Sequence, residues 1–102
     1  MSTLHTVNKS PFATQTLASC LNHAKDGDAI LMIEDGVYGA AMGTAMAGAV
    51  AAKAGTVSIF ALSGDMAARG ITEAKLIEGV KPVDYAGFVT LAADHDRAQA
   101  WL

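Results

Sequence analysis

The sequence contains one thiol, Cys20, and an imidazole, His23, follows it three residues later. If both lie on a helix, the two side chains share a face, and a nearby imidazole can favour the thiolate that sulfur-exchange chemistry requires. Cys20 also falls on the apolar face of the helix expected there, where a lone cysteine typically packs as a small hydrophobic residue. Its place in the last half of that helix disfavours a thiolate. The residues therefore leave two roles open, nucleophile or core residue.

Other polar residues follow the expected strands, where ligands of parallel sheets bind. Asn8–Ser10 and Ser63–Asp65 match neither a phosphate-binding nor a dinucleotide-binding loop, and helix capping explains Ser10 and Asp65. Glu34 and Asp35 form either an acid and base pair or a solvated turn. The three histidines lack metal-ligand spacing with the cysteine. We expect no metal and no cofactor.

Composition limits the classes of protein that remain. A chain of 102 residues with 52% hydrophobic residues supports one domain, residues 1–102, with its own core. A net charge of −3 with dispersed Lys and Arg argues against a nucleic-acid-binding module. The uncharged run 36–52 is rich in Gly and Ala, which favours close packing over membrane insertion. A single cysteine and the absence of a signal peptide predict a cytoplasmic protein.

The periodicity predicts alternating strands and helices. Strands are expected at 3–7, 29–33, 56–62, 81–83 and 97–102, and the run 29–33 is the candidate for a central strand. Helices are expected from Ser10 and Pro11 to about residue 24, at 39–54, from 63 to about 69, and at 85–93 after a capping Asp84, with a loose connection at 71–79. We therefore expect a three-layer α/β domain with a five-stranded, mainly parallel sheet, most simply in strand order 2-1-3-4-5.

Several segments along the chain together resemble the DsrH/TusB family of sulfur-relay subunits, and the likeness runs from end to end. They are LHTVNKSPF at 4–12, EDGVY at 34–38, Asp65 with ARG at 68–70, VDYAGFV at 83–89, and QAWL at 99–102. The resemblance implies the DsrE-like α/β fold and a cytoplasmic heterohexamer with two copies each of three related subunits.

The same resemblance implies what such a complex does. Persulfide sulfur passes between cysteines, and the principal cysteine belongs to the DsrE/TusD-like subunit. The implied partners are DsrE/TusD-like and DsrF/TusC-like subunits and a DsrC/TusE-like sulfur acceptor. A cysteine in the first helix is typical of the DsrH branch, so Cys20 favours sulfur oxidation. The alternative pathway is 2-thiouridine synthesis at the wobble position of transfer RNA by a TusBCD-like relay.

Roles for individual residues follow from this resemblance. Cys20 is the candidate sulfur carrier, with His23 favouring its thiolate. We expect Arg69 to pair with a carboxylate of another subunit and Trp101 to be a buried anchor. Other matching residues are assigned to structure or subunit contacts: Asp35, Tyr38, Asp65, Asp84 and Tyr85.

Three hypotheses for the function remain open. The chain is a sulfur-carrying subunit, a non-catalytic scaffold of the complex, or a stand-alone ligand binder. The third predicts a pocket beside Ser10 and Asp65 and a stable monomer.

Overall fold

A fully buried strand forms the centre of the sheet in the computed structural model, which describes residues 1–102. This strand, β2 (Ala29–Met32), lies between β1 (Thr3–Val7) and β3 (Ser58–Leu62). The edge strands are β4 (Val80–Val83) and β5 (Arg97–Trp101). All four strand pairs are parallel, so the predicted five-stranded α/β sheet is confirmed.

The predicted strand order 2-1-3-4-5 is wrong, because the observed order is β4-β3-β2-β1-β5. The predicted order would place β2 at an edge and expose its apolar side chains, whereas between β1 and β3 all four residues are buried. The polar strand β5 takes an edge instead, and four of its five residues are exposed. The chain reaches β5 by crossing from β4 at one edge of the sheet to the opposite edge, beside β1.

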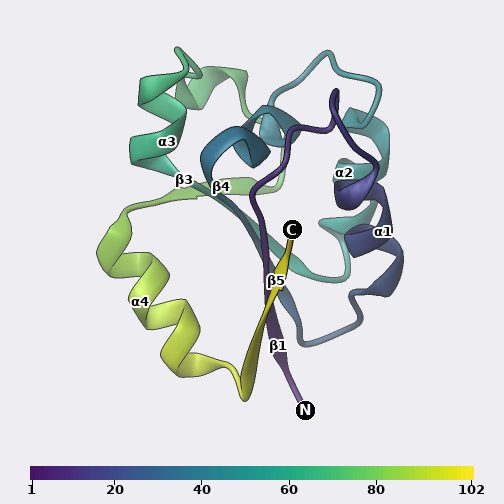
Figure 1. Ribbon diagram of the computed structural model, residues 1–102, viewed down its shortest axis with the longest axis vertical. Helices are drawn as coiled ribbons and strands as arrows, with labels where there is room; N and C mark the ends of the chain where they lie inside the picture. The colour runs from purple at the N-terminus through teal and green to yellow at the C-terminus, as the bar shows by residue number, and fades with distance from the viewer.

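Helices cover both faces of the sheet, as Figure 1 shows. The larger core cluster includes residues of α1 (Thr16–His23), the 3-10 helix η1 (Glu34–Ala40), α2 (Ala47–Lys53) and α3 (Ser63–Ala68). On the other face, the smaller cluster of Leu4, Ala29 and Leu31 packs against α4 (Tyr85–Asp94). This α4 contains no buried residue, so that layer is thinly packed. A second 3-10 helix, η2 (Glu73–Lys75), lies in the connection to β4.

Two predicted helices are shorter than expected. The predicted helix at 39–54 is reduced to α2, because Gly43 has φ +86° and residue 41 pairs with residue 76 in an antiparallel bridge. Near the N-terminus, α1 begins at Thr16 and not at Ser10. The Ser10 hydroxyl accepts a hydrogen bond from the backbone N–H of Phe12, two residues on, so it forms a local turn and caps no helix.

No helix of the structure combines the length and apolar character needed to cross a membrane.

Candidate functional site

Cys20 lies on the buried face of α1 and has no exposed surface. The pKa of its thiol is raised to about 12, mainly by burial and also by the nearby negative charge of Asp28, while the positive charge of Lys53 partly opposes the increase. The sequence placed Cys20 on an apolar helix face, and that placement is confirmed. The surroundings favour a neutral, inaccessible thiol.

His23, the expected helper of Cys20, directs its ring elsewhere. Its ring centroid lies 6.0 Å from that of His5 and 5.6 Å from that of Trp101, in edge-to-face contacts. The two aromatic neighbours come from β1 and β5, so His23 covers the junction between these strands. The geometry places this imidazole against rings and gives no sign of a thiol–imidazole pair.

A buried chain of hydrogen bonds joins Asp28, His5 and Trp101. His5 is 1% exposed, and its Nε2 lies 2.9 Å from Oδ2 of Asp28. The indole Nε1 of Trp101 donates to Nδ1 of His5 at 3.0 Å. The Asp28 carboxylate also accepts from the backbone N–H groups of Thr3 at 3.0 Å and Lys25 at 3.2 Å. Three distant parts of the sequence meet in this chain.

The ionisation of Asp28 reflects these contacts. Burial raises the pKa of this carboxyl, but hydrogen bonds from His5 and from two backbone N–H groups outweigh burial and hold the pKa below its usual value. The sequence does not predict this chain, because its histidines suggest only a metal site that their spacing does not support, and no spacing pairs Asp28 with His5. The available signal was a histidine in the middle of a strand otherwise made of Thr, Leu and Val.

Acidic residues and Arg69 meet at the carboxyl ends of β2 and β3. Nε of Arg69 donates to Oδ1 of Asp35 at 2.9 Å, and Nη1 donates to the carbonyl oxygen of Asp65 at 3.1 Å. Oδ2 of Asp65 accepts from the backbone N–H of Glu34, which has a positive φ of 50°. Arg69 thus has a carboxylate partner, Asp35, within its own chain, and its pairing with a carboxylate of another subunit stays a prediction. These hydrogen bonds of Asp65 and Arg69 attach the turn that follows β2 to α3.

The remaining predicted residues lie apart from Cys20. Asp84 caps α4 as predicted, accepting from the backbone N–H of Gly87 at 2.8 Å. Tyr85 is 71% exposed at the start of the same helix. Tyr38 packs its ring against Phe12. Trp101 is partly buried, and its indole is anchored through its hydrogen bond as well as its packing.

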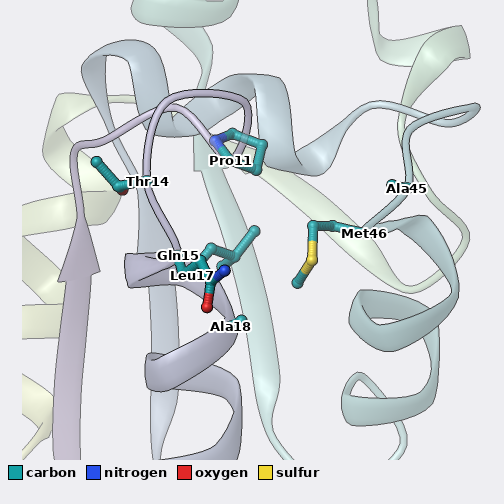
Figure 2. A pocket seen from close by; sticks show the side chains of 7 residues that line it. All are labelled: Pro11, Thr14, Gln15, Leu17, Ala18, Ala45 and Met46. Carbon is teal, nitrogen blue, oxygen red and sulfur yellow. The ribbon is translucent and has the colours of Figure 1, made fainter.

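One pocket of about 260 Å³ opens beside α1. Figure 2 shows Met46 on one side of it and Pro11 and Leu17 on the other. Its lining is Pro11, Thr14, Gln15, Leu17, Ala18, Ala45 and Met46. The lining contains no titratable side chain, and Asp65 does not contribute to it, contrary to the pocket expected of a stand-alone binder. No group of His, Cys, Asp and Glu side chains is arranged to hold a metal ion.

A family model described as "DsrH like protein" matches residues 9–98. The chain belongs to the DsrH/TusB family. Protein TusB of Shigella flexneri is 33% identical over 98 residues, covering 96% of this chain and 99% of the relative. Protein TusB of Escherichia coli O1:K1 / APEC gives the same identity and coverage. Because the match spans nearly both chains, the family resemblance seen in the sequence is confirmed.

Solved structures support the fold of this DsrH/TusB family member. The crystal structure of the ychN protein from E. coli has a TM-score of 0.77 at 17% identity and covers 98% of this chain and 99% of that one. MTH1491 from Methanobacterium thermoautotrophicum has a TM-score of 0.70 at 19% identity and covers 91% and 90%. At these identities the likeness concerns the fold alone.

Proposed function

We propose that this chain is a non-catalytic structural subunit of a heteromeric sulfur-relay complex, in which partner subunits carry the persulfide. Membership of the DsrH/TusB family supports a sulfur-relay subunit. One observation carries the finer proposal: the only cysteine of the chain is completely buried. The sulfur-carrying alternative, with Cys20 as carrier and His23 as helper, requires that this thiol become accessible.

The chemistry of sulfur transfer explains why burial matters. An acceptor thiolate attacks the terminal sulfur of a donor persulfide, a new S–S bond forms, the old S–S bond breaks, and the donor leaves as a thiolate. A thiol with a pKa of about 12 is ionised in about one molecule in 10⁵ at pH 7. The donor must also reach the sulfur, and Cys20 has no exposed surface.

Exposed apolar side chains support a subunit that assembles with partners. The side chains of Phe12, Met42, Tyr85 and Val89 are each more than half exposed. Large apolar residues at the surface are typical of protein–protein contacts. We propose a cytoplasmic heterohexamer with DsrE/TusD-like and DsrF/TusC-like subunits, serving a DsrC/TusE-like acceptor.

Two pathways use such complexes, and one observation favours each. The cysteine in α1 favours the DsrH branch and sulfur oxidation. The 33% identity with relatives named TusB supports 2-thiouridine synthesis at the wobble position equally well. Deletion of the gene for this chain separates them: loss of 2-thiouridine from transfer RNA supports the second pathway, and loss of sulfate formation from stored sulfur supports the first.

Intact-mass measurement tests the structural role. The wild type and Cys20→Ala, each alone and with its partner subunits, are incubated with a persulfide donor. We expect no sulfur on this chain, one added sulfur on a partner, and equal relay with either variant, whereas omission of this chain reduces assembly and relay. A gain of one sulfur atom that disappears in Cys20→Ala and is removed by an acceptor thiol overturns the structural role.

A further inference from the structure

The C-terminal strand β5 is attached to the rest of the protein by its backbone ladder with β1 and by few side-chain contacts. It pairs only with β1, and four of its five residues are exposed. At its start, Nε of Arg97 donates to the Thr3 hydroxyl at 3.3 Å. At its end, Trp101 donates to His5 and is the single partly buried residue of the strand. The indole is therefore the main side-chain anchor of this end of β5.

The two contacts of His5 are compatible with only one protonation state. Nδ1 accepts the indole N–H of Trp101, so Nδ1 carries no proton. Nε2 faces the carboxylate of Asp28, so Nε2 carries the proton and donates it. In the opposite tautomer, the Nδ1–H would face the indole N–H of Trp101, and the lone pair of Nε2 would face the Asp28 carboxylate, so both contacts would be repulsive. The buried imidazole is thus neutral, with its proton on Nε2.

Addition of a second proton affects the two contacts differently. The Nε2–H···Asp28 hydrogen bond persists and becomes an ion pair. A proton on Nδ1 would meet the indole N–H of Trp101 head-on, so this contact must break. Protonation therefore removes the Trp101 anchor and leaves Asp28 in place.

We propose that the Asp28–His5–Trp101 chain is an acid-sensitive latch, in which protonation of His5 at Nδ1 releases Trp101 and loosens β5 from β1. A looser β5 detaches more often, and each detachment makes the backbone groups at the edge of β1 available to another strand. This proposal is independent of the proposed function.

Charged and titratable groups around the latch come from every element packed against it. Asp28 precedes β2, His23 and Cys20 lie on α1, Arg97 lies on β5, and Lys53 of α2 acts on Cys20. Asp28 is bonded to His5 in both states, so it does not oppose release. The His23 ring lies 6.0 Å from the His5 ring, so a positive charge on His23 would repel one on His5.

Nuclear magnetic resonance of the full chain tests the latch. The ¹⁵N and ¹³C shifts of His5 report its tautomer, and we expect the Nε2–H form at neutral pH. Amide hydrogen exchange, corrected for the intrinsic effect of pH, reports the β1–β5 pairing. We expect protection of this ladder to fall at least about five-fold, the loss of one hydrogen bond, as His5 becomes protonated, while the β2–β3 ladder keeps its protection.

Two variants make the test specific. Trp101→Phe keeps a ring and removes the donor, so β1–β5 protection should already be low at neutral pH and should respond no further to His5 protonation. His23→Gln removes the neighbouring titratable ring, and the response should persist. The latch is overturned by an Nδ1–H tautomer in the wild type, by an unchanged response in Trp101→Phe, by loss of the response in His23→Gln, or by simultaneous loss of protection in both ladders. The tautomer measurement uses the wild type alone, so it stands even if Trp101→Phe fails to fold.

Discussion

Replacement of Asp28 by Asn changes one oxygen of a buried carboxylate into an N–H₂ group. The carboxylate accepts from His5 at 2.9 Å, from the Thr3 N–H at 3.0 Å and from the Lys25 N–H at 3.2 Å, through both oxygens. An amide has one acceptor oxygen, so at least one buried donor faces the N–H₂ group. An unpaired buried donor costs about 1–3 kcal/mol, and the remaining bonds lose their charge assistance. We expect Asp28→Asn to lower the free energy of unfolding by about 2–4 kcal/mol.

The pH dependence gives a second, independent readout for this variant. The pKa of Asp28 is lower in the folded protein than its ordinary value, because hydrogen bonds outweigh burial. Its contribution is therefore complete above the unfolded pKa of about 3.9 and is lost as pH falls towards the folded pKa. The stability difference between wild type and Asp28→Asn should shrink as pH falls from about 5 to about 3.

Urea unfolding measures both effects through the fluorescence of Trp101, the single tryptophan. Asp26→Asn is the matched control, because Asp26 is exposed in the same turn, and this change should stay within about 0.5 kcal/mol of the wild type. The reasoning is refuted if Asp28→Asn costs no more than Asp26→Asn at pH 7, or if its cost is constant down to pH 3.

Three further substitutions, one of them with a matched control, test other contacts. Gly36→Ala should prevent stable folding, because a Cβ there would collide with the backbone carbonyl oxygen at the end of β1. In the control Gly48→Ala the added Cβ meets nothing within 4 Å, so this change should be neutral or stabilising by up to about 1 kcal/mol. Thermal unfolding compares the two variants. Asp84→Ala should cost about 1 kcal/mol in urea unfolding by removing the cap of α4, and equal stability would exclude a capping role. Arg69→Ala should cost less than about 1 kcal/mol, because Asp35 is 62% exposed; a larger loss would show that the guanidinium holds the turn more strongly than its exposure allows.

The sequence predicted elements well where one local signal dominated. The uninterrupted apolar run at 29–33 identified the central strand, and Asp84 marked the start of α4, because each signal is carried by residues adjacent in the sequence. The prediction of a helix over 39–54 is wrong, because a contact between distant residues overrides the local signal. Its Ala-rich composition favours a helix, but pairing with residue 76 holds residue 41 extended, and this partner is distant in sequence.

In the candidate site, too, the local features were predictable from the sequence and the contacts between distant residues were not. The apolar face around Cys20 was readable from helical spacing, and with it the burial that raises the pKa of the thiol. The partners of His5 were not readable, because Asp28 and Trp101 lie 23 and 96 residues away. Nothing in the spacing of these residues specifies that they meet.

By itself, the sequence determined the fold class, five strands, and membership of the DsrH/TusB family, because periodicity, capping and motifs are properties of short segments. Tertiary structure decided the strand order, the partner of Arg69, and the buried chain that ties the C-terminal strand to the sheet. These features depend on which distant segments bury their apolar and polar groups together. That choice is made by the free energy of the whole chain, and no local pattern records it.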